Sequence, residues 1–135
     1  MDQPQQPGEL RYSLDLPAAR DDVWELWTVA RRLTDWLCAS AAVEPTAGGR
    51  FLIDWEREPI VGEVLFIDRP RLLLLEWRID ARLTGVEVDL RPSLAGTRVE
   101  VTHCGLPDAE LREGADRRWQ AALERLRGLT GSASL

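Results

Sequence analysis

Five consecutive segments in the second half of the chain alternate apolar and polar side chains, and this pattern limits the fold more than any other feature. The segments cover residues 50–56, 60–68, 71–80, 84–91 and 97–104. Alternation with a period of two is typical of β-strands that have one buried face. The connections are short, whereas parallel neighbours need a crossover of a dozen or more residues. We therefore expect an antiparallel meander with one apolar face.

The apolar face of such a sheet needs a cover, and the only long helical pattern in the chain, at residues 108–129, can supply it. Its apolar side chains recur at steps of three and four, and charged residues occupy the opposite side. The stripe consists of Leu111, Ala115, Trp119, Ala122, Leu126 and Leu129. Asp108 is predicted to cap the helix and Gly131 to stop it. The expected fold class is α+β, a curved antiparallel sheet wrapped around a long C-terminal helix.

The first third of the chain adds smaller elements to this plan. Residues 9–16 alternate as a strand, which we expect to pair into the sheet and curve it. Two short helices follow at about residues 21–28 and 31–37, with a bend near Val29, and residues 39–44 form a weak strand. We expect one domain over residues 9–130, a disordered polar tail at 1–8 and a C-terminal tail at 131–135.

Composition excludes several classes of function. The net charge is −6, and the basic residues, all arginine, are not gathered into a patch, so nucleic acid is not an expected partner. No apolar run approaches the roughly 20 residues that span a bilayer, so membrane insertion is not expected. No signal pattern opens the chain, and we expect a cytoplasmic protein. Cys38 and Cys104 lack metal-ligand spacing, so neither a metal nor another cofactor is expected.

The strand phases and the helix stripe together define an inner wall, whose members are the candidate ligand-binding residues. These are Phe51, Ile53, Trp55, Val64, Phe66, Leu75, Trp77, Val86, Val88, Val101, His103, Trp119, Ala122 and Leu126. An empty void of roughly 300 Å³ would cost on the order of 7 kcal/mol, comparable to the stability of a whole domain. Either aromatic side chains fill most of the space, or water or a ligand occupies it. With six tryptophans in the chain, we predict a modest apolar cavity under the helix.

His103 is the only histidine and the weak catalytic candidate. A general base needs a partner that orients it, and no Ser, Asp or Glu shares its predicted inner face. Cys104 points to the opposite face, which disfavours a Cys-His dyad. We therefore favour a structural or ligand-contacting hydrogen bond for His103. The outer face carries charged side chains, among them Glu63, Glu76 and Arg78, which we interpret as a solvated lattice.

Several short motifs, in this order and spacing, resemble a known family. They are Val23-Trp24 with Trp27-Thr28, Trp36, Gly48-Gly49-Arg50-Phe51, Gly62-Glu63-Val64, Pro70-Arg71-Leu72 with Trp77, Gly96-Thr97-Arg98, Thr102-His103-Cys104-Gly105-Leu106, and Trp119 to Leu126. Residues 9–129 resemble the helix-grip, START-like superfamily, and within it small bacterial domains similar to the C-terminal domain of the Hsp90 ATPase activator. The resemblance implies a sheet gripping a C-terminal helix, often with a cavity for a hydrophobic molecule. It does not imply one activity.

Three functions follow as hypotheses. The first is non-enzymatic binding of a small hydrophobic molecule, aromatic or acyl, between the sheet and the helix. The second is an enzyme similar to polyketide cyclases, with His103 and Tyr12 or arginines steering a substrate. The third is an interaction protein that stimulates a chaperone ATPase, as in a stress response. A homodimer is compatible with all three.

Overall fold

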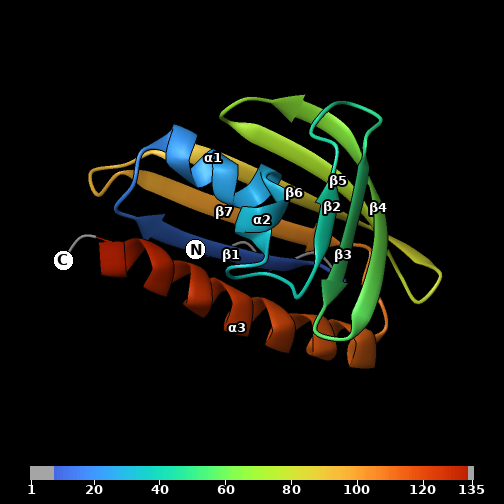
Figure 1. Ribbon diagram of the computed structural model, residues 1–135. Coiled ribbons are helices and arrows are strands. Elements are labelled where there is room, and N and C mark those ends of the chain that lie inside the picture. The colour runs from blue at the N-terminus through green and yellow to red at the C-terminus, as the bar shows by residue number, and fades with distance from the viewer. Residues whose placement is uncertain (1–7, 134–135) are drawn as a thin grey trace.

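The computed structural model describes residues 8–133, so most of the predicted N-terminal tail and the last two residues lie outside the described residues. Within these residues, seven strands and three helices follow one another (Figure 1). They are β1 (Leu10–Leu16), α1 (Arg20–Thr28), α2 (Ala30–Leu33), β2 (Ala41–Val43), β3 (Arg50–Trp55), β4 (Glu58–Asp68), β5 (Leu72–Ile79), β6 (Arg82–Pro92), β7 (Thr97–Cys104) and α3 (Ala109–Ala133).

The strands form one antiparallel sheet in the order β1-β7-β6-β5-β4-β3-β2. Strands β2 to β7 follow each other as the predicted meander, and β1 pairs with β7, from Leu10 opposite His103 to Leu16 opposite Thr97. Figure 1 shows the β2–β4 end crossing the β6–β7 end at a steep angle, with α3 running along the open side of this curve. The predicted α+β fold with a gripped C-terminal helix is confirmed.

Helix α3 begins where the sequence predicts and ends later. The Asp108 Oδ1 atom accepts hydrogen bonds from the backbone N–H of Glu110 (2.8 Å) and Leu111 (3.2 Å), which satisfies two donors at the helix start. The helix continues to Ala133, so the predicted stop at Gly131 is wrong. Glycine ends a helix where it adopts a left-handed conformation, but inside a helix it only weakens it by about 1 kcal/mol.

The predicted bend between the two short helices is confirmed. Val29 has an extended backbone (φ −96°, ψ 119°) between α1 and α2, although neither Gly nor Pro stands there. Helix α2 ends at Leu33, earlier than the predicted residue 37. The indoles of Trp27, from α1, and Trp36, which follows α2, contact each other with ring centroids 4.6 Å apart. This contact closes one end of the space between the sheet and α3.

One inner-wall prediction is wrong because strand β4 contains a β-bulge. Val64 pairs with Leu75, but the next pair is Phe66 with Leu74, so Leu65 is an extra residue on β4. One extra residue reverses the inward and outward alternation of everything beyond it. Phe66 consequently lies on the outer face with 46% of its surface exposed.

Candidate functional site

The other thirteen predicted wall residues lie together between the sheet and α3. All are at most 5% exposed: Phe51, Ile53, Trp55, Val64, Leu75, Trp77, Val86, Val88, Val101, His103, Trp119, Ala122 and Leu126. Strands β3 to β7 supply the first ten, because inward side chains of neighbouring strands stand opposite one another in the register. Helix α3 supplies the last three, at steps of three and four residues. Their shared location is established, and ligand contact by them remains a prediction.

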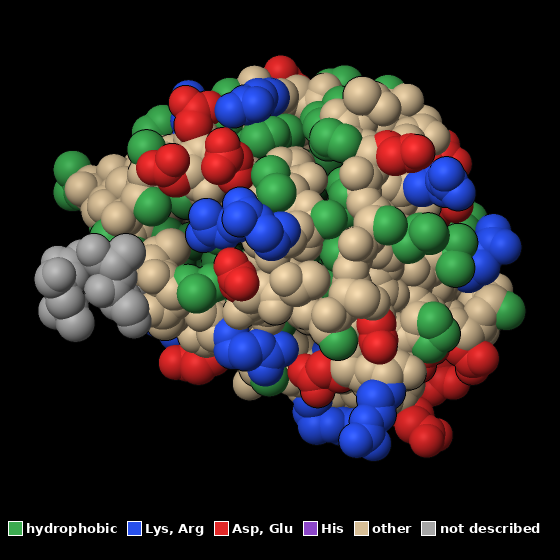
Figure 2. Space-filling model, in the orientation of Figure 1, with side chains coloured by type: hydrophobic (Ala, Val, Ile, Leu, Met, Phe, Trp, Pro, Cys, Tyr) green, Lys and Arg blue, Asp and Glu red, His purple; other side chains and the backbone are tan. Residues whose placement is uncertain are grey.

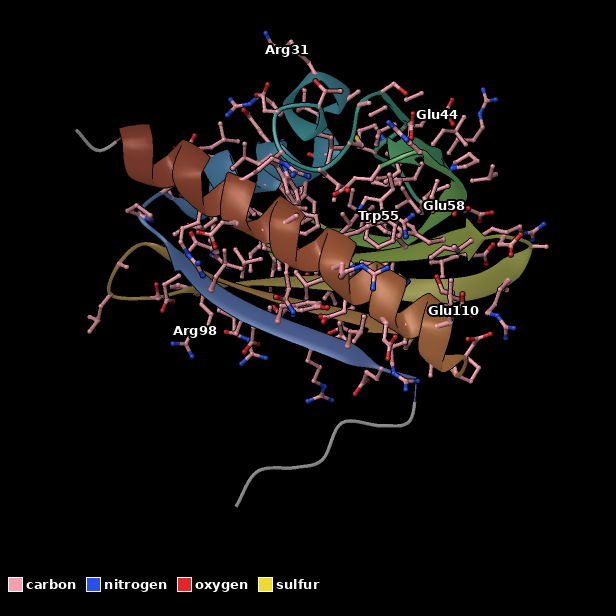
Figure 3. All side chains as sticks on the ribbon, turned by 90° about the horizontal axis from the view of Figure 1, so that it is seen from below. Arg31, Glu44, Trp55, Glu58, Arg98 and Glu110 are labelled. Atoms are coloured by element: carbon pink, nitrogen blue, oxygen red, sulfur yellow. The ribbon has the colours of Figure 1, made fainter. Side chains whose placement is uncertain are left out.

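Three tryptophans from distant parts of the chain meet at the centre of this space. The indoles of Trp77 on β5 and Trp119 on α3 are stacked, with ring centroids 5.4 Å apart and planes at 8°. Trp55 on β3 meets both rings edge-on, at centroid distances of 5.1 Å and 5.4 Å. In Figure 3, Trp55 lies between α3 and the strands behind it. We call Trp55, Trp77 and Trp119 the central tryptophans.

Aromatic rings occupy the space in which the sequence predicted a modest cavity. Trp27 extends the central tryptophans toward α1, with its ring centroid 6.3 Å from that of Trp119. Five pockets of about 250–390 Å³ border α3, the loops or the outer face of the sheet. None of these five is lined by Trp77, Trp119 or His103. Of the two alternatives drawn from the sequence, the ring contacts at the centre favour filling by aromatic side chains.

His103 is hydrogen-bonded through both ring nitrogens inside this cluster. The Trp119 Nε1–H donates to His103 Nδ1 at 2.9 Å. On the other side, His103 Nε2 lies 2.9 Å from Thr84 Oγ1, and Thr84 Oγ1 donates to the carbonyl oxygen of Trp77 at 2.7 Å. Because Nδ1 accepts and the Thr84 hydroxyl proton is used on a carbonyl, the network assigns the neutral tautomer with the proton on Nε2.

Burial lowers the pKa of His103 to about 3, because the charged imidazolium would lose its hydration in this apolar space. His103 is therefore neutral near pH 7, fully buried and bonded at both nitrogens. Neither nitrogen is free to take a proton from a substrate. The sequence analysis missed Thr84 as its partner, although Thr84 shares the strand phase of Val86 and Val88 and could have been placed on the inner face.

Three other buried indoles lack any hydrogen-bond acceptor among the described residues. The Nε1–H groups of Trp27, Trp55 and Trp77 are unpartnered. In contrast, Trp36 Nε1–H donates to the Leu26 carbonyl oxygen at 2.9 Å, and Trp119 donates to His103. Buried tryptophan N–H groups usually find a partner. The cluster therefore combines one satisfied polar network with three unsatisfied donors.

Arginines of α3 border the cluster on the β3 side. The Arg118 guanidinium lies over the Trp55 ring, 5.6 Å from its centroid. About two helical turns further along α3, Arg125 Nε donates to the Trp36 carbonyl oxygen at 2.9 Å, and its Nη2 lies 3.6 Å from a carboxylate oxygen of Glu56. A surface pocket of about 310 Å³ is lined by Trp36, Cys38, Glu56 and Arg125 among others. This pocket adjoins the aromatic cluster at its Trp36 end.

Tyr12, the second residue of the cyclase hypothesis, is bonded to α3. Its hydroxyl donates to Asp116 Oδ1 at 2.5 Å, and the other Asp116 oxygen accepts from Gln120 at 2.9 Å. Burial, and then the neighbouring Asp116 carboxylate, raise the pKa of Tyr12 above its ordinary range. The tyrosine consequently joins β1 to α3 and makes no hydrogen bond to His103.

The surface on the helical side carries acidic and basic side chains mixed together, and no histidine is visible on it (Figure 2). Within residues 8–133, no three His, Cys, Asp or Glu side chains are grouped so that they could hold a metal ion. No helix of the described part is long and apolar enough to cross a membrane. Cys38 is buried and Cys104 is exposed, and both are free thiols.

Solved structures show that this architecture recurs. The chain is similar to protein MLL2253 of Mesorhizobium loti, at 20% identity over 94% of this chain and 99% of that chain, with a TM-score of 0.85. It is also similar to PFC0360w, an HSP90 activator from Plasmodium falciparum, at 19% identity over 91% and 96% of the two chains and a TM-score of 0.76.

A third similar structure is DynU16, described as a putative protein in the dynemicin biosynthetic locus. It is 22% identical over 89% of this chain and 46% of its own, with a TM-score of 0.79. At these identities the likeness concerns the fold. No protein with curated annotation matches the chain. The sequence profile described as "Activator of Hsp90 ATPase homolog 1-like protein" matches residues 17–131, and the chain belongs to that family.

Proposed function

We propose that this protein binds a small hydrophobic molecule between the sheet and α3 without chemically changing it. The proposed ligand is aromatic and carries a hydrogen-bond acceptor such as a carbonyl group. The observation that carries the proposal is the set of buried, unpartnered Nε1–H groups of Trp27, Trp55 and Trp77. A ligand of this kind would stack on the indoles and accept from at least one of them.

The energetic argument rests on the cost of unsatisfied donors. A buried donor without a partner costs about 1–3 kcal/mol, and native proteins contain few of them. Three such groups among the rings of one core are more than close packing alone requires. An acceptor that does not belong to the chain would recover part of this free energy, whereas a purely apolar molecule would not.

The ligand needs space that the rings now fill, and the contacts indicate which ring can yield. Moving Trp77 or Trp119 would break their stacking, and moving Trp119 would also break its bond to His103. The Trp55 indole makes no hydrogen bond, and the Arg118 guanidinium lies over its ring. We therefore expect Trp55 to rotate when a ligand enters, on the side where Arg125 joins α3 to Trp36.

Binding without catalysis is favoured over the cyclase hypothesis by the state of His103. Its neutral, buried ring is used at both nitrogens, and Tyr12 is bonded to Asp116. The similar DynU16 belongs to a biosynthetic locus and the similar PFC0360w is an HSP90 activator, and both descriptions concern those proteins.

We propose the cytoplasm as the compartment, in line with two free thiols. Cell fractionation tests the compartment.

Ligand binding is tested by native mass spectrometry of gently purified protein and by thermal shift with two matched panels. One panel holds planar aromatic ketones and quinones, and the other holds aromatic hydrocarbons of the same size without an acceptor. We expect a retained mass or a higher Tm with the first panel and weaker effects with the second. Equal responses to both panels would remove the role of the indole donors, and no response to any compound would contradict the proposal.

A second experiment removes the donor and keeps the ring. Replacing Trp55 or Trp77 by the benzothiophene analogue of tryptophan deletes the N–H with little change in shape. We expect affinity for the ketone panel to fall about tenfold, the equivalent of one hydrogen bond. The same replacement at Trp119 is the control, since it should lower stability by releasing His103.

A further inference from the structure

The outer face of the sheet carries an apolar patch that the described part of the chain leaves uncovered. Four large side chains on it are about half exposed or more: Val61 (60%), Leu83 (54%), Leu65 (51%) and Phe66 (46%). The half-buried Leu52, Leu72 and Leu74 lie on the same face of β3 and β5. We call these seven residues the outer patch.

The register makes the outer patch continuous across neighbouring strands. Val61 on β4 stands opposite Arg78 on β5, and Arg78 stands opposite Leu83 on β6. Four residues away along β5, on the same face, Leu74 stands opposite Phe66 of β4. The bulge at Leu65 enlarges the patch, because it places two consecutive large apolar side chains outward.

The other half of the outer face differs in kind. On β1, β6 and β7, cross-strand ion pairs link Arg98 to Asp15 (3.3 Å) and Arg91 to Glu100 (3.5 Å). Arg98 lies beside β1 in Figure 3. The charges predicted as a solvated lattice therefore neutralise each other on this half. Away from these ion pairs, the exposed apolar side chains Val61, Leu65 and Phe66 lie on β4, and Leu83 lies at the start of β6.

The charged side chains next to the outer patch are not neutralised. Glu63 and Glu76 stand directly opposite each other on β4 and β5, an arrangement of like charges that destabilises a sheet. Neither carboxylate forms an ion pair, and the exposed Arg78, two residues from Glu76 on the same strand, has no carboxylate partner among residues 8–133. The surface thus presents two unpaired acids beside one unpaired base.

We propose that the outer patch binds a second copy of this chain in a two-fold symmetric pair. A two-fold axis running across β5 between Glu76 and Arg78 places the arginine of each copy opposite Glu76 of the other, since an isologous interface repeats every contact. The same operation sets Leu83 over Gly85, which has no Cβ atom to obstruct it. Two copies therefore pair the charges that one copy leaves unpaired, and each covers Val61 and Leu83 of the other.

The size of the outer patch sets the expected strength. Four strands spaced about 4.8 Å apart, over about six residues at about 3.3 Å each, cover about 400 Å². Standard specific interfaces bury about 800 Å² per partner. An interface of this size lies below the standard range, so we expect a weak and reversible pair.

Sedimentation equilibrium from about 2 to 500 μM of the full chain tests the proposal, because that range detects weak self-association. We expect a monomer–dimer equilibrium that Arg78→Glu weakens about tenfold or more. Adding Glu76→Arg to that variant exchanges the two charges, and dimerisation should return to within about threefold of the wild type. Arg31→Glu makes the same charge change at an exposed position of α2, away from the outer face of the sheet, and as the matched control it should leave dimerisation unchanged.

Two results would overturn the proposal. One is a wild-type chain that stays monomeric at every concentration, in which case the outer patch faces water or a different protein. The other is a dimer that Arg78→Glu leaves intact, which would place the contact on another surface. Circular dichroism of each variant confirms that a lost dimer is not a lost fold.

Discussion

Strands β4 and β5 have two faces that are incomplete in different ways. Toward α3 they carry Val64, Leu75 and Trp77, which are buried, and the Trp77 N–H lacks an acceptor. Toward the outside the same strands carry Glu63 and Arg78, where apolar surface is exposed and charges lack counter-charges. The inner face lacks one small polar group, which a ligand can supply, and the outer face lacks cover, which another protein surface can supply. One sheet can therefore serve two classes of partner.

The two phenylalanines of the chain give the largest contrast between the faces. Phe51 is 1% exposed on the inner face, and Phe66 is 46% exposed on the outer face. We expect Phe51→Ala to lower the free energy of unfolding by about 3–5 kcal/mol through lost burial and a residual cavity. Phe66→Ala should cost about 1 kcal/mol or less. Urea unfolding of dilute protein measures both, and equal losses would show that Phe66 is buried.

Acid should destabilise the inner face through His103. The pKa of His103 is about 3 when folded and about 6.5 when unfolded, so between these values the unfolded chain binds the extra proton. The free energy of unfolding therefore rises with pH in this range. Each unit of acidification below pH 6.5 lowers it by about 1.4 kcal/mol, so the total loss at pH 4 is about 3 kcal/mol. Below pH 3 both states are protonated and this contribution stays constant.

The control for the measurement of stability against pH is His103→Gln, because glutamine does not titrate. Carboxylates also contribute to acid unfolding, so the difference between the two proteins isolates the histidine. The variant should be less stable at pH 7 and should lose less on acidification. Parallel curves for variant and wild type would mean that His103 titrates normally in the folded state.

The stacked tryptophans Trp77 and Trp119 allow a test at equal burial. Both are 0% exposed, but only the Trp119 N–H has an acceptor. Each change to Phe removes the same ring volume, while Trp119→Phe also leaves His103 Nδ1 without a donor. We expect Trp119→Phe to cost about 1–3 kcal/mol more than Trp77→Phe in chemical unfolding. A larger loss for Trp77→Phe would show that its N–H has a partner.

Much of the inner face could be predicted from the sequence because alternation along a strand depends only on backbone geometry. Phe51, Trp55 and Trp77 were placed correctly in this way. Phe66 was not, because Leu65 and Phe66 are both apolar and a bulge at Leu65 leaves no trace in the pattern. The alternation also predicted the outward direction of Glu63 and Glu76.

The chemistry of the site depended on features that a pattern does not contain. Thr84 could have been assigned to the inner face, yet its bond to His103 depends on the β6–β7 register. The orientation of each indole decides whether its N–H meets an acceptor, so Trp77 and Trp119 look equivalent in the sequence. The filled space beneath α3 likewise depends on how Trp55 packs against two rings from other elements.

The smallest predicted effect is a gain in stability, and it concerns the outer face of the sheet. Glu76→Arg replaces a like-charge pair with an ion pair to Glu63 directly opposite, so the monomer should gain about 0.5 kcal/mol, measured at low micromolar concentration and low salt. High salt should erase the gain, because these side chains are in contact with water. The same substitution should weaken the proposed dimer, since Arg78 of the second copy would then meet a positive charge. A variant with a higher free energy of unfolding and weaker dimerisation would show that the Glu63–Glu76 pair favours the dimer while it destabilises the monomer.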